Sequence, residues 1–529
     1  MEITTKATEP GAEPTAERVR LPLSRAVAIG VVTVIAAVAA GHLVAGLINP
    51  AASPVIAVGN SVRDLTPPAV TEWAIANLGD VKKPLVFVGL GIALLVAGAI
   101  AGLVSRRRPW PGMGIAAAIG IVGLVSVADQ ATVSGFDLLA PVLSMLTGVG
   151  VFLLLHRVAR GQGGASEAQT AGSNRRRFLW TTGGVAVGAA AFGAVGQFLA
   201  TLRDAESSRA AIGTLTPSTP APPVPAGADF ARQGTPRFLT SNRDFYRVDT
   251  ELLSVPQVRA EDWLLRVHGL VDNTKTFTFN DIRNRPLVER TITMTCVSNE
   301  VGGPYISTAN FIGVPLRDLL DEAGVRAGAD QLFSSSVDGW TAGSPVDAAM
   351  DRNRGALLAI GMNGEPLPVE HGFPARMVIP GLYGFVSATK WVVDMELTTF
   401  AARESYWRKR GWGIKAPIKT QSRIDAPRGF ATLPPGKVTI AGVAWAQTVG
   451  IDKVEVRLNG GNWQEAELTT EVNTQTWRMW RLNVNLAPGS YKAEVRATDR
   501  RGNTQPADRV PPIPDGATGW HSTDFTVSR

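Results

Sequence analysis

Residues 291–304 read TITMTCVSNEVGGP and place the only cysteine of the 529-residue chain, Cys296, directly after an apolar run. The run Thr291–Thr295 predicts a short strand, and the loop that follows it is polar and rich in glycine. A strand end that opens into such a loop can present a side chain to a ligand, although a lone cysteine is more often a small buried apolar residue. With one cysteine, neither an intramolecular disulfide nor an all-cysteine metal cluster can form within one chain.

Five apolar runs lie upstream of this strand, in a chain with 45% hydrophobic and 18% charged residues. They cover Ala26–Ile48, Leu85–Val104, Gly112–Ala128, Leu138–Leu155 and Phe178–Leu202. The first run contains no Asp, Glu, Lys or Arg. As a helix it would be about 34 Å long, which is enough to cross a bilayer. These runs predict an α-helical transmembrane region over residues 21–202 with about five helices.

Basic residues flank these runs unevenly. They gather before the first run, after the second, and between the fourth and fifth, at Arg18, Arg20, Arg25, Arg106, Arg107, Arg108, Arg157, Arg160 and Arg175–Arg177. Because cytoplasmic loops carry the excess of Lys and Arg, this pattern predicts a multi-pass protein of the cell membrane. Residues 1–20 would be a cytoplasmic tail, and the C-terminal part would be extracytoplasmic. The net charge of +7 is then largely a topological signal, and no nucleic-acid partner is predicted.

The segment before the fifth run, Asn174–Leu179, reads NRRRFL and resembles a twin-arginine export motif. It also fits an ordinary basic cluster at a membrane boundary. Export by the twin-arginine route carries proteins that have already folded around a cofactor. The two histidines of the apolar region, His42 and His156, fall near opposite membrane faces, so the sequence does not predict that they share a haem.

The C-terminal part divides into three segments. Residues 203–235 include TLTPSTPAPPVP at 214–225 and predict an extended proline-rich linker that holds the next domain away from the membrane. Residues 236–410 combine strand-like and helix-like patterns, such as Trp263–Val267 and Val314–Ala323, and predict a mixed α+β domain. Residues 411–529 alternate apolar and polar positions between glycine-containing turns, which predicts a β-sandwich.

Further motifs follow Cys296 in a fixed order: VPLRDLL at 314–320, MNGEPLP at 362–368, HGFPAR at 371–376, VIPG at 378–381 and Lys390-Trp391. With the cysteine loop, this order resembles the sulfite oxidase family of molybdenum enzymes. Gly442–Trp445 and Val454–Leu458 resemble that family's immunoglobulin-like dimerisation domain. The resemblance implies a molybdopterin-binding catalytic domain over 236–410, an immunoglobulin-like domain over 411–529, and a homodimer formed through the latter.

The resemblance also implies roles for individual residues. Cys296 matches the thiolate that binds molybdenum, and a soft thiolate suits such a metal. His371 and Arg376 match residues that hold the pterin, although alone they would also fit a core histidine and a structural ion pair. Met362 and Trp391 are predicted to lie in the core. The positions expected to bind the molybdopterin cofactor are Asn242, Phe245, Tyr246, Arg247, Cys296, Asp338, His371, Arg376, Ser387, Thr389 and Lys390.

Three features depart from the family's pattern, and one of them is that the family's active-site tyrosine has no clear counterpart in Asp338–Gly343. A pocket arginine of the family is replaced by Glu300, a candidate catalytic residue here, and the first-loop arginine falls at Val248 unless a shift of one residue brings in Arg247. A unit charge pair at ~5 Å is worth about 3 kcal/mol near the protein surface, so a carboxylate in this place argues against sulfite, a dianion, as the substrate.

The resulting hypothesis is a membrane-anchored molybdopterin-dependent oxidoreductase that carries out two-electron oxygen-atom transfer on a small substrate outside the cytoplasmic membrane. A reductase acting on a sulfoxide-type group is the alternative within the family. A cofactor-free surface adhesion protein is the alternative outside it. Because the sequence has no CxxCH haem motif and no four-cysteine cluster, an external electron-transfer partner is expected.

Overall fold

The computed structural model describes residues 20–67, 70, 82–130, 135–161, 171–202, 205–250 and 255–529. By contacts the chain divides into two compact units, Met1–Leu202 and Arg203–Arg529. The predicted cytoplasmic tail lies outside the described residues except for Arg20.

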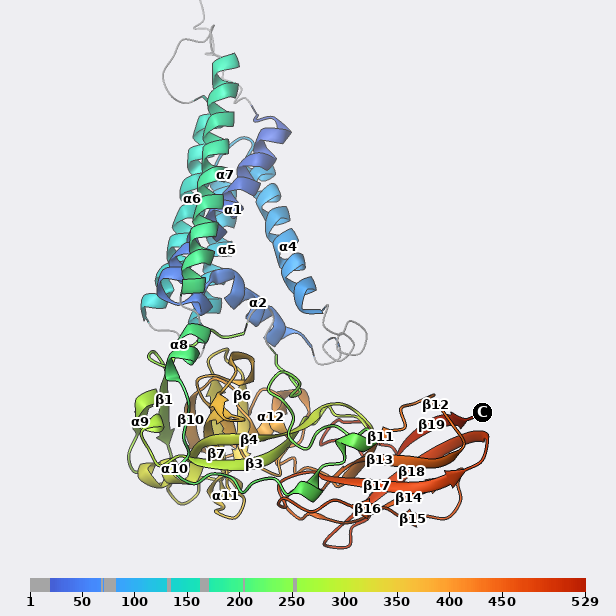
Figure 1. The fold of residues 1–529 in the computed structure, drawn as a ribbon. Helices are drawn as coiled ribbons and strands as arrows, with labels where there is room; N and C mark the ends of the chain where they lie inside the picture. The colour runs from blue at the N-terminus through green and yellow to red at the C-terminus, as the bar shows by residue number, and fades with distance from the viewer. Residues whose placement is uncertain are drawn as a thin grey trace, which may run out of the picture. The chain divides into compact units, whose positions relative to one another are not determined.

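The N-terminal unit is helical in its described part. Its helices are α1 (Leu23–Ile48), α2 (Pro54–Leu65), α4 (Lys82–Val104), α5 (Trp110–Ala128), α6 (Leu139–Ala159) and α7 (Ala171–Leu202), with 3-10 turns η1 (Pro50–Ala52) and η3 (Gly135–Leu138) (Figure 1). Five segments are long and apolar enough to cross a membrane: Leu23–Ile48, Leu85–Val104, Trp110–Ala128, Gly135–Ala159 and Arg175–Leu199. The five predicted apolar helices are therefore confirmed as helices. The amphipathic helix α2 is an addition that the apolar runs do not predict.

Helix α1 packs against α4, α6 and α7. At its crossing with α4 the two backbones approach so closely that a Cβ on Gly30 would overlap the carbonyl oxygen of Gly98, and one on Gly102 would overlap that of Ala26. Small residues let two apolar helices approach closely enough for tight van der Waals packing between their backbones.

The C-terminal unit begins with an α+β domain that contains two sheets (Figure 1). The first has the order β2-β1-β10-β5-β6, from β1 (Leu264–Gly269), β2 (Lys275–Thr278), β5 (Gln331–Ser336), β6 (Thr341–Pro345) and β10 (Val392–Thr398). The second has the order β3-β4-β7-β8, from β3 (Val288–Thr295), β4 (Ile306–Pro315), β7 (Leu357–Met362) and β8 (Glu365–Pro366), and β9 (Arg376–Val378) pairs with β7. Only β1 and β10 pair in parallel among the described strands of this domain.

Short helices join these strands: α9 (Phe279–Arg283), α10 (Leu316–Ala323), α11 (Val346–Met350), α12 (Gly384–Ser387), and the 3-10 turns η6 (Val369–His371) and η7 (Arg408–Arg410). Helix α10 confirms the amphipathic helix predicted from VPLRDLLDEA. It buries Leu316, Leu319, Leu320 and Ala323, which recur at the spacing of one helix face, and it ends at Gly324 with φ of 71°.

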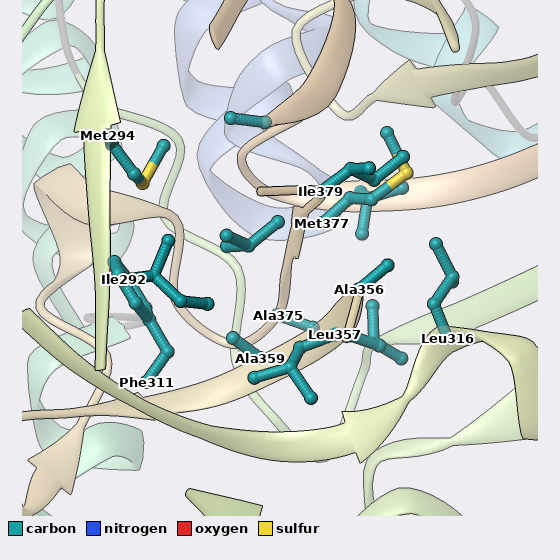
Figure 2. Packing of buried hydrophobic residues seen from close by; sticks show 14 of the residues in the cluster. Ile292, Met294, Phe311, Leu316, Ala356, Leu357, Ala359, Ala375, Met377 and Ile379 are labelled. Carbon is teal, nitrogen blue, oxygen red and sulfur yellow. The ribbon is translucent and has the colours of Figure 1, made fainter. Parts of the chain in front are cut away.

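The second sheet contributes much of the core behind the cysteine loop. Ile292 and Met294 on β3, Phe311 on β4 and Met377 on β9 belong to one buried cluster, and Figure 2 shows them gathered around a common interior. Met362 and Trp391 are 0% and 2% exposed, as predicted for core residues. This packing fixes the end of β3, from which Cys296 follows.

Two further sheets form the C-terminal β-sandwich. One has the order β11-β13-β17-β16, and the other β12-β19-β18-β14-β15. Their bounds are β11 (Gln421–Ala426), β12 (Thr432–Leu433), β13 (Gly436–Trp445), β14 (Ile451–Leu458), β15 (Gln464–Glu465), β16 (Glu467–Leu468), β17 (Arg478–Leu486), β18 (Gly489–Asp499) and β19 (His521–Val527). Residues of both sheets, such as Ile440 and Val456, share one buried cluster, so the all-β prediction is confirmed.

The proline-rich segment differs from the predicted spacer. It contains α8 (Ala205–Ile212), η4 (Ala226–Ala228) and η5 (Ala231–Gln233), and it buries Leu215 and Phe230 in the core of the C-terminal unit. Thr219 forms a parallel bridge with Val288 of β3. Apolar residues between the prolines thus attach the segment to the domain.

Candidate functional site

A pocket of about 110 Å³ in the C-terminal unit is lined by Cys296 and by seven more of the predicted site residues. These residues come from the segment before β1, from the loops after β3 and β5, from η6 and β9, and from the residue pair before β10, so distant segments of sequence meet in one pocket. The seven are Phe245, Tyr246, Arg247, Asp338, His371, Arg376 and Lys390.

Cys296 lies in the pocket wall at the start of a loop that closes on itself. Its backbone N–H donates to the carbonyl of Tyr305 at 3.0 Å, and its carbonyl accepts from Asn299 at 3.1 Å. The Asn299 side chain in turn accepts from the Tyr305 N–H at 2.8 Å. The thiol is free and only 9% exposed, and burial raises the pKa of Cys296. The loop therefore presents one fixed thiol to the pocket.

His371 and Arg376 flank a tight turn. The Nε2 atom of His371 lies 2.9 Å from the Asn242 carbonyl, which can only accept, so this nitrogen carries the proton. Burial and then the Arg376 charge lower the pKa of His371 to about 4, so the imidazole is neutral near pH 7. Its Nδ1 atom is then an acceptor.

Arg376 is 5% exposed and donates through Nη1 to the His371 carbonyl at 3.0 Å. Its Nε has no hydrogen-bond partner among the described residues. Burial lowers the pKa of Arg376 to about 10, which still leaves the guanidinium charged at neutral pH. A buried cation with an unused donor is a position prepared for an acceptor.

A buried carboxylate joins two cations at another part of the wall. Asp249 is 3% exposed at its side chain and its Oδ2 lies 2.6 Å from Arg247 Nε and 3.4 Å from Lys390 Nζ. Lys390 also donates to the Glu370 carbonyl at 3.2 Å and lies over the Trp391 ring. Tyr246 also lines the pocket, and burial raises the pKa of its phenol, which keeps the hydroxyl protonated.

Four predicted site residues do not line the pocket. Asn242 supports it from behind, since its carbonyl accepts from His371 and its side chain bonds Asn363 and Met362. Ser387 donates to the Leu382 and Tyr383 carbonyls, and Thr389 pairs with Ser334 at 2.7 Å; both are buried. Glu300, the predicted catalytic residue, is exposed in the turn after Cys296 and is not among the residues that line the pocket.

The sequence interpretation missed an aromatic wall and Asp249. The wall consists of Trp340, Phe385, Trp407 and Trp412, whose rings line the pocket. Trp407 and Trp412 stand in the segment YWRKRGWG at 406–413. This segment has several aromatic residues but no strand pattern, and that was the signal in the sequence for an aromatic contribution to the site. Asp249 ends the segment NRDFYRVD at 242–249. The signal in the sequence was a carboxylate two residues after Arg247.

Two family models match most of the C-terminal unit. A family model described as an oxidoreductase molybdopterin binding domain matches residues 252–407, and one described as a Mo-co oxidoreductase dimerisation domain matches residues 414–523. The mitochondrial sulfite oxidase of Macaca fascicularis is 31% identical in an alignment 329 positions long that covers 53% of this chain and 59% of that protein. The chain thus spans less than two thirds of that relative.

Two further similarities concern a second relative and a solved structure. The sulfite oxidase of Gallus gallus is 30% identical in an alignment 337 positions long that covers 54% of this chain and 72% of that protein. The structure of the sulfane dehydrogenase SoxCD from Paracoccus pantotrophus aligns with a TM-score of 0.48 at 23% identity, covering 55% of this chain and 84% of that one. By its matched domains and its sulfite oxidase relatives, the chain belongs to the sulfite oxidase family of molybdenum-cofactor oxidoreductases.

Proposed function

We propose that this protein is a membrane-anchored enzyme that uses the molybdenum cofactor for two-electron oxygen-atom transfer on a small substrate outside the cytoplasmic membrane. The observation that carries the proposal is the juxtaposition of the single buried thiol, Cys296, with Arg376 and Lys390 in one pocket of a domain of this family. A soft ligand and two cations match a cofactor that carries both a metal and a phosphate.

The residues present fit such a cofactor. Arg376 Nε and Ser336 Oγ are buried atoms of pocket-lining residues, and neither has a hydrogen-bond partner in the described structure. Buried donors of this kind are costly unless a ligand satisfies them, and the pterin and its phosphate offer acceptors. When bound, the cofactor supplies the oxygen-atom transfer itself.

The chain's own residues would bind and orient the cofactor. In the proposed site Cys296 binds the metal, while Arg247, Arg376 and Lys390 hold the anionic end of the cofactor. His371 is a neutral residue whose Nε2 proton is engaged by Asn242, so it presents Nδ1 as an acceptor to N–H groups of the pterin. Phe245 stacks on Tyr246 with centroids 5.4 Å apart, and Asp338 caps its own turn through Trp340 N–H.

The aromatic wall supports a substrate that is neutral and soft. Trp340, Phe385, Trp407 and Trp412 offer apolar faces, which favour sulfur-bearing or other polarisable groups over a dianion. Reduction of a sulfoxide is therefore the second candidate: R₂SO takes up two electrons and two protons and yields R₂S and water. In either direction the electrons pass to or from an external redox partner.

The proposed orientation rests on where the basic residues lie in the helical unit. Arg106 Nε donates to the Leu21 carbonyl at 2.7 Å, and Arg160 Nη2 donates to the Arg106 carbonyl at 3.4 Å. Arg25 lies 5.8 Å from the Phe178 ring at the start of α7. The beginnings of α1 and α7 and the ends of α4 and α6 thus share one basic end. Under the positive-inside rule this end is cytoplasmic, so an odd number of spans places the C-terminal unit outside.

Two further parts complete the proposal. The chain is exported by the twin-arginine route through Arg175–Arg177, and its C-terminal β-sandwich is immunoglobulin-like and forms a homodimer.

The decisive experiment measures bound cofactor. The full chain is purified in detergent, and molybdenum and pterin are quantified in the wild type, in Cys296→Ser and in the matched control Glu300→Gln, which alters an exposed side chain of the same loop. Molybdenum in the wild type and the control but not in Cys296→Ser supports the assignment. A wild type free of molybdenum and pterin overturns it. Parallel assays of sulfite oxidation and sulfoxide reduction then decide between the two candidate reactions.

A further inference from the structure

The strand that leads to Cys296 has an outer edge that its own sheet leaves unpaired. In the order β3-β4-β7-β8, β3 pairs only with β4 inside the sheet. The β-sandwich and its loops close the other edge. Thr293 N–H donates to the Gln475 carbonyl at 3.0 Å, and the Gln447 side chain donates through Nε2 to the Thr293 carbonyl at 3.0 Å. Asn473 Nδ2 donates to the Thr291 carbonyl at 3.1 Å.

The side chain of Thr293 is held from the same direction. Its Oγ1 accepts from the backbone N–H of Trp477 at 2.7 Å, and Trp477 is 2% exposed. The N–H, carbonyl and hydroxyl of Thr293 are therefore all bonded by residues 447–477. Thr293 is 1% exposed and stands three positions before Cys296, so these bonds fix the backbone from which the thiol is presented.

The sandwich also holds the far side of the cysteine loop. Arg423 on β11 is 7% exposed and donates through Nη1 to the Gly303 carbonyl at 2.7 Å. Gly302, with φ of 83°, lies so close to the ring of His521 that a Cβ would overlap it. His521 is itself fixed because its Nδ1 accepts from the Ile424 N–H at 3.0 Å. The loop is thus bounded by sandwich residues both before and after Cys296.

We propose that the C-terminal β-sandwich positions Cys296, with Gln447 and Arg423 as positioning residues for the thiol. The inference rests on the proposed function only in naming Cys296 as the metal ligand. The hydrogen bonds from the sandwich to Thr293 and Gly303 are a property of the chain itself. It gives the sandwich a part in the site in addition to any part in dimer formation. A side chain that binds a metal must be held within a fraction of an ångström for the metal to be bound in one geometry. The hydrogen bonds from the sandwich would hold Cys296 in this way.

The test exploits the single cysteine, because alkylation of a thiol, located by peptide mass spectrometry, reports on Cys296 alone. The cofactor-free full chain in detergent is treated with iodoacetamide at fixed pH, and the rate constant is followed by mass spectrometry. Gln447→Met keeps the volume and removes the donor to Thr293. Gln505→Met is the matched control, since Gln505 is 2% exposed and bonds the Gly519 carbonyl and Ser422 within the sandwich, away from β3. Arg423→Met and Arg423→Lys form a second pair, in which lysine retains a donor for Gly303.

Loss of a buried hydrogen bond should let the strand end open more often, so Gln447→Met and Arg423→Met are expected to raise the rate constant by about fivefold or more. Gln505→Met and Arg423→Lys should stay within about twofold of the wild type. If Gln447→Met does not fold, Asn473→Leu tests the same edge. Equal rate constants for Gln447→Met and Gln505→Met would overturn the proposal. Absence of molybdenum from the wild type would instead overturn the proposed function, while the comparison of alkylation rates would stand.

Discussion

Lys390 Nζ and Asp249 Oδ2 lie 3.4 Å apart in the pocket wall, although the two residues are 141 positions apart in the sequence. The same oxygen accepts from Arg247 Nε at 2.6 Å, so one buried carboxylate separates two cations. The carboxylate therefore has an electrostatic function in the folded chain whether or not a cofactor is bound, because without it two positive charges would face each other in a confined place.

Replacement of this carboxylate should destabilise the C-terminal unit. Asp249→Asn leaves Arg247 and Lys390 without their shared counter-charge, and we expect the free energy of unfolding to fall by about 2 kcal/mol, less than for a fully buried pair because Arg247 is partly exposed. Urea titration of the cofactor-free chain, followed by tryptophan fluorescence, measures the change. Asp244→Asn is the control, since Asp244 pairs with an exposed Arg243 and should leave the midpoint unchanged. Equal midpoints for the two variants would contradict the prediction.

The chemically functional residues of the site could be predicted from the sequence, but some of the residues that line the pocket could not. Cys296, His371 and Arg376 stand in ordered motifs with a recognisable spacing, so their types and order sufficed to identify the family. Trp407 and Trp412 come from a segment without a regular secondary-structure pattern, beyond the last strand of the α+β domain. Only the folded chain brings that segment beside residues 245–250, because such contacts depend on tertiary packing rather than on local periodicity.

Glu300 and the proline-rich segment show two further limits. A charge at an aligned position says nothing about the direction of its side chain, and the turn through Gly302 and Gly303 leaves Glu300 exposed to solvent. Proline content predicts an extended backbone, but it does not reveal that Leu215 and Phe230 have partners in the adjacent domain. By contrast, the long apolar helices and the alternating strands were predictable, because their periodic patterns extend over many residues.

Arg376 offers a way to separate binding from stability. Arg376→Met removes a buried charge that has one protein hydrogen bond, so the unfolding free energy of the cofactor-free chain should stay level or rise. Pterin retained after purification should nevertheless fall by about tenfold or more, since charge-assisted hydrogen bonds are worth about 1.5–3 kcal/mol. Fluorescence of the released pterin and a urea titration give the two values. A variant that loses stability but keeps its pterin would assign Arg376 a structural role instead.

The pH dependence of the β-sandwich should carry a signature of His521. Burial and then the charges of Arg423 and Arg509 lower the pKa of His521 to about 4. An unfolded histidine has a pKa near 6.5, so between about pH 6.5 and 4 the unfolded chain binds a proton that the folded chain does not. Stability contributed by the neutral ring is therefore complete above about pH 6.5 and is lost as the pH falls, by up to about 3 kcal/mol near pH 4.

Replacing the ring by an uncharged side chain should remove that slope. The urea midpoint of His521→Gln should depend less on pH than that of the wild type between pH 7 and 4.5, even if its value at pH 7 is lower because the contact with Gly302 is altered. Parallel curves for the two chains over this interval would show that the proton is taken up elsewhere.

The crossing of α1 and α4 gives a prediction for the helical unit. A Cβ on Gly98 would lie 2.7 Å from the Gly30 carbonyl oxygen and 2.8 Å from the Val34 side chain, so Gly98→Leu must separate the two helices. Overpacking of this kind costs about 1–3 kcal/mol, and the lost backbone contact adds to it. Gly91→Leu on the same helix is the matched control, because no atom lies within 4 Å of the corresponding Cβ. Heating the full chain in detergent and measuring the fraction that still elutes as a monodisperse species should give a lower midpoint for Gly98→Leu alone. Equal losses in both variants would indicate that leucine disturbs α4 itself rather than its contact with α1.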